Sequence, residues 1–322
     1  MTEVATIGSP LFYIVFFVAV LVMIGIDMLT LKKTGAHKVS TKEALIWTVV
    51  WVLVSCAFAG WLYWEVAQSH GAALAKTKVL EYFTGYVLEK SLAVDNLFVF
   101  LMIFSYFKVP AQYQHRVLLY GVLGAIVLRA IMVFVGAALV SRFEWILYVF
   151  GAFLLYTGIK MVKHNDGDDN EDLSQNKMLQ WLKKHIHVSE RLDDEKFFTI
   201  ENGKRIATPL LLVLIMVELS DVVFAIDSIP AIFAVTTDPF IVLTSNIFAI
   251  LGLRAMYFLL ADMADRFVYL HYGLAFVLSF IGIKMLILHW VHIPVGISLS
   301  VVFTALVVAM AASLLHKPKR TE

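Results

Sequence analysis

One apolar stretch that carries three carboxylates constrains this chain more than any other feature. Residues 210–235 form an apolar run long enough to cross the hydrocarbon core of a bilayer as a helix, which takes about 20 residues. Within it stand Glu218, Asp221 and Asp227. Ionisable groups at membrane depth are costly and usually face the interior of a bundle. The stretch therefore predicts a membrane-spanning helix with a functional site.

A second acidic stretch, residues 87–100, resembles the first. Its sequence L-A-V-D-N around Asp95 matches F-A-I-D-S around Asp227. Six residues before each central aspartate stands another acid, Glu89 in one stretch and Asp221 in the other. Two related acidic helices are the main indication of what the protein does.

Composition places the whole chain in a membrane. The 322 residues are 60% hydrophobic and 16% charged, with a mean hydropathy of +0.81, so we expect an all-α polytopic membrane protein whose immediate partner is the lipid bilayer. The net charge of +1 gives no reason to expect a nucleic-acid partner. The single cysteine, Cys56, excludes an intrachain disulfide.

The apolar runs predict about nine transmembrane helices, each long enough to cross the membrane. They lie at residues 10–31, 44–64, 79–106, 115–140, 145–162, 208–236, 240–261, 267–289 and 293–315. Basic residues gather in the loops of one side, so the positive-inside rule places the N-terminus in the periplasm and the C-terminus in the cytoplasm.

The runs divide the chain into five parts. Between the helical parts, one long loop is expected to hold a short amphipathic helix near residues 178–186 and a hairpin with its turn at Asn202-Gly203. The parts are two N-terminal helices (1–65), a first three-helix unit (79–163), the cytoplasmic loop (164–207), a second three-helix unit (208–290), and a last helix with a basic tail (293–322).

The two three-helix units share three landmarks in the same order. After each acidic helix comes a helix with the sequence L-R-A, which contains Arg129 in the first unit and Arg254 in the second. The sequence G-I-K-M then occurs at 158–161 and again at 282–285. Because each unit has an odd number of spans, the second copy is expected to be inverted, which is the plan of many secondary transporters. Chance similarity between apolar helices is the alternative.

The polar residues of the acidic helices suit a metal cation. All of them offer oxygen ligands, which hard cations such as Mg²⁺, Ca²⁺ and Mn²⁺ prefer. Successive helical residues turn by about 100°, so Asp227 points about 120° away from Asp221 on a regular helix. Pro230 therefore predicts a local break near Asp227. The candidate ligands are Asp95, Asp227, Glu89, Glu218 and Asp221, assisted by Asn96 and Ser228.

These carboxylates carry more negative charge than one divalent ion neutralises. Either some of them hold protons, or the cations Lys90, Arg129 and Arg254 pair with them. Proton exchange for metal is the coupling that this surplus favours. A plainer alternative is that the ion pairs only lock helices together.

The acidic motifs, E-K-S-L-A-V-D-N at 89–96 and E-L-S-D through A-I-D-S at 218–228, resemble those of the TerC family of integral membrane proteins. The stretch T-T-D-P-F-I-V-L-T-S-N at 236–246 is similar to the Alx branch of that family. The resemblance implies a bacterial inner-membrane protein with a fold like that of LysE-type exporters. It also implies Mn²⁺ efflux, and a link to the response to alkaline pH.

We therefore expect a transporter and not an enzyme, with Mn²⁺ as transported substrate and no resident cofactor. Homo-oligomers are compatible with the sequence. The alternatives are an exporter of another substrate, a membrane scaffold or redox modulator, and a tellurite-resistance factor without transport activity. An oxyanion substrate would need the arginines to face the cavity. A scaffold would tolerate loss of the intramembrane acids.

Overall fold

Helices occupy the apolar runs in a computed structural model of the chain. The structure describes residues 6–34, 40–143, 145–163, 188–189, 193–201, 204–261, 269–287, 290–291 and 293–315. The helices are α1 (Pro10–Thr34), α2 (Thr41–His70), α3 (Ala72–Tyr106), α4 (Ala111–Arg142), α5 (Ile146–Lys163), α7 (Pro209–Phe233), α8 (Pro239–Leu251), α9 (Leu253–Ala261), α10 (Leu270–Leu286) and α11 (Val295–Leu315).

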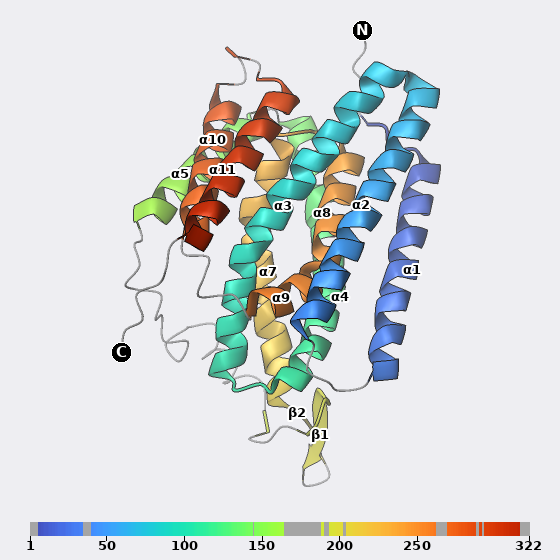
Figure 1. Cartoon of the computed structure of the whole chain (residues 1–322), viewed down its shortest axis with the longest axis vertical. Coiled ribbons are helices and arrows are strands. Elements are labelled where there is room, and N and C mark those ends of the chain that lie inside the picture. The colour runs from blue at the N-terminus through green and yellow to red at the C-terminus, as the bar shows by residue number, and fades with distance from the viewer. Residues whose placement is uncertain are drawn as a thin grey trace.

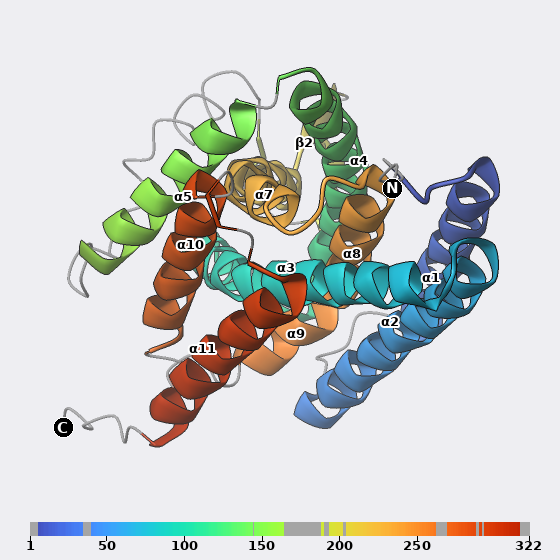
Figure 2. The same ribbon diagram turned by 90° about the horizontal axis from the view of Figure 1, so that it is seen from above.

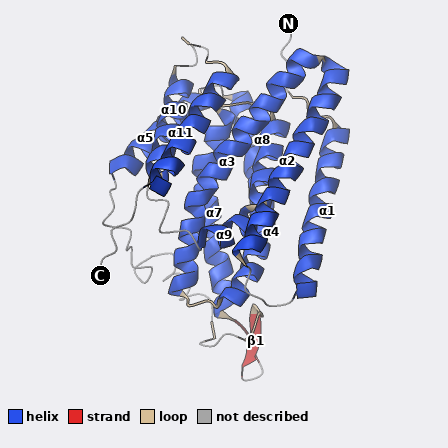
Figure 3. Cartoon of the chain, in the orientation of Figure 1, coloured by secondary structure: helices blue, strands red, loops and turns tan. Residues whose placement is uncertain are grey.

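The expectation of an all-α membrane protein is confirmed, whereas the number of crossings stays a prediction. Within the described residues, four helices are long and apolar enough to span a bilayer, or five if the bent pair α8–α9 counts as one span. Shorter apolar helices cover Pro10–Ile26, Ile146–Val162 and Tyr272–Leu286. In Figure 3 the described part of the chain consists of helices, short connecting loops and one small hairpin.

The helices form one bundle with two recognisable ends. The N-terminus lies at the upper end in Figure 1, and the hairpin lies at the lower end. Seen from above, α7 stands between α5 and α10 on one side and α4 and α8 on the other, while α1 and α2 flank the bundle (Figure 2). We call the two ends of the bundle the N-terminal end and the hairpin end.

The hairpin expected in the long loop is present. Strands β1 (Phe198–Glu201) and β2 (Lys204–Ala207) pair antiparallel, with Glu201 opposite Lys204. It is tied to the start of α4 by an ion pair of 3.0 Å between Arg116 Nη1 and Glu195 Oε2. The residues of the turn, Asn202-Gly203, and the amphipathic helix predicted near 178–186 lie outside the described residues.

The helix break lies elsewhere than the sequence predicts. Helix α7 continues through Asp227 and Pro230 to Phe233, so the expected local break near Asp227 is wrong. A proline removes one N–H donor while its φ stays compatible with a helix, so neighbouring turns can hold α7 together. The chain bends instead by 42° between α8 and α9, where Gly252 separates the two helices.

Two glycines allow α5 and α10 to cross with their backbones almost in contact. A Cβ atom at Gly158 of α5 would lie 2.9 Å from the backbone N of Ser279, and one at Gly282 of α10 would lie 2.6 Å from the backbone N of Leu155. Gly282 and Ser279 each follow their counterparts, Gly158 and Leu155, by 124 residues. Each contact therefore joins one residue to the counterpart of the residue in the other contact, at a constant offset in sequence.

Candidate functional site

The centre of the bundle holds a completely buried arginine. Arg129 of α4 has no exposed surface, and its guanidinium donates two hydrogen bonds to Asp221 of α7, Nε to Oδ2 at 3.2 Å and Nη2 to Oδ1 at 2.9 Å. Nη1 of the same group forms an ion pair with Oε1 of Glu89 on α3, which is also fully buried. One cation thus joins both acidic helices, and a two-bond pairing of this kind fixes geometry as well as charge.

Asn246 of α8 completes the cluster and was not among the residues singled out from the sequence. Its Oδ1 accepts a hydrogen bond of 3.0 Å from Arg129 Nη1, and its Nδ2 donates to Glu89 Oε2 at 3.5 Å. The side chain is fully buried. A polar residue inside the apolar sequence of α8 was the available signal, because a buried amide needs partners.

Helical spacing explains why some predicted ligands meet and others do not. Ser228 follows Asp221 by seven residues, which is close to two turns, and it accepts a hydrogen bond of 3.4 Å from Arg129 Nη1. Asn96 follows Glu89 by the same interval and is also buried, so it lies on the same face of α3. A residue six positions further along the helix, instead of seven, points about 120° away from that face.

That six-residue offset applies to the two central aspartates, Asp95 and Asp227. Their backbones lie in α3 and α7, but their side chains lie outside the described residues. From helix geometry, both positions turn away from the face that Arg129 contacts. The structure therefore places Glu89 and Asp221 in one charged cluster and leaves the placement of the two aspartates as a prediction.

Glu218 occupies a niche made by a glycine. It precedes Asp221 by three residues on α7 and is half-buried. A Cβ atom at Gly124 of α4 would collide with its carboxyl group. Oε2 of Glu218 is buried and has no hydrogen-bond partner among the described residues. A carboxylate oxygen in this position is available to a proton or a cation.

The second arginine, Arg254, lies near the same acid. Arg254 stands at the start of α9, directly after the bend at Gly252, and lines a small cavity together with Asp221. The cavity measures about 20 Å³, which is enough for about one water molecule. Asp221 therefore contacts Arg129 and borders a small space that Arg254 also lines.

Lys90 does not join the central ion pairs that the structure describes. Its Nζ donates a hydrogen bond of 2.9 Å to the carbonyl oxygen of Ala249 in the last turn of α8 and lies 5.8 Å from the centre of the Tyr86 ring. A side chain at Gly252 would contact this ammonium group. Among the described contacts Lys90 binds the end of a helix, and its role in charge pairing stays a prediction.

The cluster has a surplus of negative charge but no complete metal shell within the described residues. When ionised, Glu89 and Asp221 together outweigh the single charge of Arg129, and an unbalanced buried charge is costly. Among the described side chains, no group of three His, Cys, Asp or Glu residues could share one metal ion. A proton or a further cation must therefore enter the charge balance.

An all-helical bundle with apolar spans and a buried arginine–carboxylate cluster defines a polytopic membrane protein, because helices satisfy their own backbone groups in lipid. The chain belongs to the TerC family of integral membrane proteins, whose family model matches residues 74–321.

Curated relatives match almost the whole chain. A protein of Shigella flexneri named "Putative membrane-bound redox modulator Alx" is 57% identical over 302 residues, which cover 94% of each chain. A protein of the same name in Photorhabdus laumondii is 53% identical over 98% of this chain and 99% of its own. An uncharacterized membrane protein of Myxococcus xanthus, STKORF319, is 46% identical over 99% of this chain and 97% of its own. No solved structure matches.

Proposed function

We propose that the chain is a divalent-cation transporter that exports Mn²⁺ across the bacterial inner membrane. The observation that carries the proposal is the fully buried Arg129, which draws Glu89 and Asp221 together from two different helices. Ionised groups at this depth are expensive to maintain and are typical of ion pathways. The choice of manganese and the direction of transport come from the resemblance to the family.

In this proposal Arg129 is the counter-ion of the metal-free site. Its guanidinium keeps Glu89 and Asp221 close together when no metal is bound. Asp95 and Asp227, which turn away from Arg129 on their helices, are the proposed primary metal ligands. Glu218, Asn96 and Ser228 provide further oxygen atoms close to the cluster. Oxygen ligands of this kind suit Mn²⁺ and disfavour Cu(I).

The proposed architecture is a pair of inverted three-helix repeats, α3–α5 and α7–α10, with the site at their interface. The reciprocal crossing of α5 and α10 supports it, because a two-fold axis would map Gly158 onto Gly282 and Leu155 onto Ser279. Helix packing agrees, since α3 packs on α8 and α7 packs on α4. The first repeat keeps its arginine helix continuous, whereas the second divides it at Gly252.

The proposed coupling is exchange of protons for metal. Glu89 and Asp221 exceed the charge of Arg129, and Glu218 presents a buried oxygen without a described partner. Protons on these carboxylates would balance the metal-free site, and their release would balance an entering divalent ion. The N-terminus is proposed to be periplasmic and the C-terminus cytoplasmic, following the distribution of basic loops.

Metal flux in proteoliposomes tests the proposal. Vesicles loaded with Mn²⁺ and carrying a pH gradient should show flux with the unmodified protein, and the flux should respond to the gradient. Asp95→Asn and Asp227→Asn should abolish it while the protein still inserts. Repeating the assay with Mg²⁺, Ca²⁺ and Zn²⁺ measures selectivity. Arg142→Gln, at the exposed end of α4, is the control for loss of one charged group.

The same assay addresses the rival functions. Full flux in both aspartate variants would show that the site is assigned wrongly. Absence of flux for every cation, with correctly inserted protein, would instead favour a scaffold or a redox modulator. The second of these is the role in the name of the Alx relatives. Redox chemistry by a pair of cysteines is excluded, since Cys56 is the only cysteine in the chain.

A further inference from the structure

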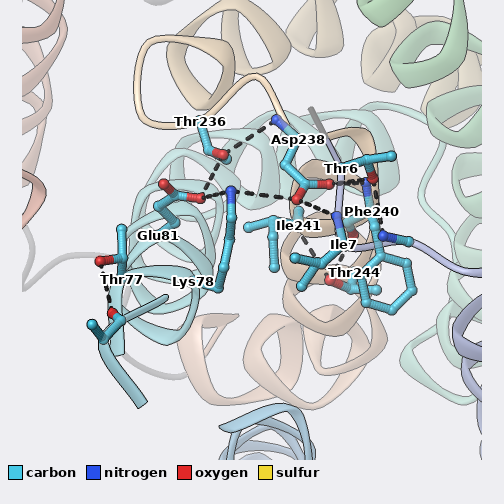
Figure 4. Close-up of polar contacts among 12 residues, drawn as sticks. Thr6, Ile7, Thr77, Lys78, Glu81, Thr236, Asp238, Phe240, Ile241 and Thr244 are labelled. Atoms are coloured by element: carbon cyan, nitrogen blue, oxygen red, sulfur yellow. Dashed lines mark hydrogen bonds and ion pairs between the residues drawn. The ribbon is translucent and has the colours of Figure 1, made fainter. Parts of the chain in front are cut away.

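A second buried charged cluster lies at the N-terminal end of the bundle, apart from the central site. Figure 4 shows it as a continuous set of polar contacts between the segment before α1, the first turns of α3 and the connection from α7 to α8. We call it the latch. It consists of Thr6, Ile7, Lys78, Glu81, Thr236 and Asp238.

Asp238 is the hub of the latch. Its carboxylate accepts hydrogen bonds from Thr6 Oγ1 at 2.8 Å and from the backbone N–H of Ile7 at 3.0 Å, and it lies 3.4 Å from Lys78 Nζ. It also caps α8 by accepting a hydrogen bond of 3.1 Å from the backbone N–H of Phe240. This carboxylate therefore joins three separate parts of the chain.

The other half of the latch holds α3 to the same connection. Lys78 Nζ donates to Glu81 Oε2 at 2.9 Å, and Thr236 Oγ1 donates to the same oxygen at 2.6 Å. All three side chains are buried. Lys78 thus bridges the carboxylates of Glu81 and Asp238, and the α7–α8 connection is bound to α3 through both of them.

The latch lies directly above the central cluster on the same two helices. Glu81 precedes Glu89 by eight residues on α3, and Asp238 precedes Asn246 by eight residues at the start of α8. Eight helical residues rise by about 12 Å, so the latch and the central cluster are two layers of one α3–α8 interface.

Between these layers the two helices are in close contact. A Cβ atom at Gly85 of α3 would come within 2.7 Å of Ser245 Oγ on α8, and Ser245 is fully buried. Access to the central cluster along this interface therefore requires α3 and α8 to separate. Among the described polar contacts, those of the latch oppose such separation at the N-terminal end.

The N-terminal segment lies outside the part of the chain that the family model matches. Thr6 and Ile7 precede residue 74, where the match begins, whereas Lys78, Glu81 and Asp238 lie inside it. The segment contacts Asp238 through two hydrogen bonds, and the side chain of Ile7 is buried in the apolar core. Both hydrogen bonds come from residues that precede α1.

We propose that the latch closes the N-terminal end of the bundle over the central cluster, and that the N-terminal segment holds it shut by occupying Asp238. The inference rests on the transport function proposed above, because a transporter must open this end to one side of the membrane while a scaffold need not. Its test is independent of flux. The accessibility of the α3–α8 interface shows whether the latch is closed, whereas cation flux shows whether the protein transports.

The test uses a cysteine placed between the two layers. Ser245→Cys in a Cys56→Ser background puts one thiol below the latch, and a membrane-impermeant thiol reagent is added from the side of the N-terminus. Labelling should be slow while the latch is intact. Asp238→Asn should accelerate it several-fold, since asparagine still caps α8 but loses the charge that binds Lys78. Thr6→Val, which removes one hydroxyl, should accelerate it less.

Glu195→Gln is the matched control, because it neutralises an acidic partner of an ion pair at the hairpin end. Its labelling should equal that of the parent. Equal rates in the parent, Asp238→Asn and Thr6→Val would overturn the latch even if Mn²⁺ flux is intact. Acceleration by Glu195→Gln to the same degree would also overturn it, since general loosening would then explain the effect. If the labelling rate rises in Asp238→Asn and Thr6→Val but the protein carries no cation flux, the latch is supported and the transport function is refuted.

Discussion

The two buried charged clusters of the bundle are built around hubs of opposite sign. At the centre, the cation Arg129 binds side chains from three other helices. In the latch, the anion Asp238 binds two side chains and also two backbone N–H groups. Backbone donors remain in place when a side chain is changed. The central cluster, which has no such donors among its described contacts, is therefore the less tolerant of substitution.

The strongest way to test this comparison is to remove the central hub. Arg129→Met leaves Glu89 and Asp221 buried without their common cation, and breaking a buried ion pair in this way costs about 3–5 kcal/mol. We expect a corresponding fall in the free energy of unfolding, measured by denaturant titration in micelles. Arg142→Met, at the exposed end of the same helix, is the control and should unfold like the parent. An unchanged midpoint for Arg129→Met would contradict the central role of this arginine.

A smaller effect is expected from the amide that bridges the cluster. Asn246→Ala leaves Glu89 and Arg129 each without one hydrogen bond, which costs about 1–3 kcal/mol for a buried polar group. The same unfolding measurement checks it. Thr244→Val is the control two residues earlier on α8, because the described hydrogen bonds of the Thr244 hydroxyl go to carbonyls of its own helix. If both variants lose the same stability, the bridge has no special contribution.

The hub of the latch should be less sensitive than either central residue. Asp238→Asn keeps one oxygen that can cap α8 and accept from Thr6. It loses the charge near Lys78 and the second oxygen, which accepts from the backbone N–H of Ile7. We expect destabilisation of about 1 kcal/mol by the same titration. A loss as large as that of Arg129→Met would show that the two clusters do not differ in tolerance.

The smallest effect belongs to the half-exposed ion pair at the hairpin end. Glu195→Gln removes the partner of Arg116, whose guanidinium also lies over the Phe197 ring. Pairs of this exposure contribute about 0–1 kcal/mol, and salt screens them. The unfolding midpoint should therefore move little, and raising the ionic strength should remove any shift. A larger shift would place the hairpin among the essential contacts of the bundle.

Sequence reasoning identified the residues of the central cluster better than it predicted their pairing. Glu89, Asp221, Ser228 and Arg129 were all singled out, because charged and polar side chains are rare in apolar runs. Their pairing depends on how three helices are rotated against one another, and periodicity within one helix does not contain that information. The role of Asn246 was missed for the same reason.

The position of the helix break illustrates a second limit. Pro230 is the stronger local signal, yet α7 continues past it, while the chain bends at Gly252. One missing N–H is tolerated within a long helix when surrounding turns remain bonded. A glycine bends a helix only when tertiary contacts favour the bend, and here the Lys90 ammonium occupies the space that a side chain at 252 would need. That contact joins positions far apart in the sequence.

The short helix α8 has a charge of the appropriate sign at each end. Asp238 stands at its N-terminus, and the Lys90 ammonium binds the carbonyl of Ala249 in its last turn. The peptide dipoles of a helix sum to a positive N-terminus and a negative C-terminus, so both charges oppose the macrodipole. Asp238 is attached to α8, whereas Lys90 belongs to α3. Any displacement of α8 from α3 therefore uncovers the negative pole of the helix deep in the low-dielectric interior, and the electrostatic cost of the movement is concentrated at Lys90.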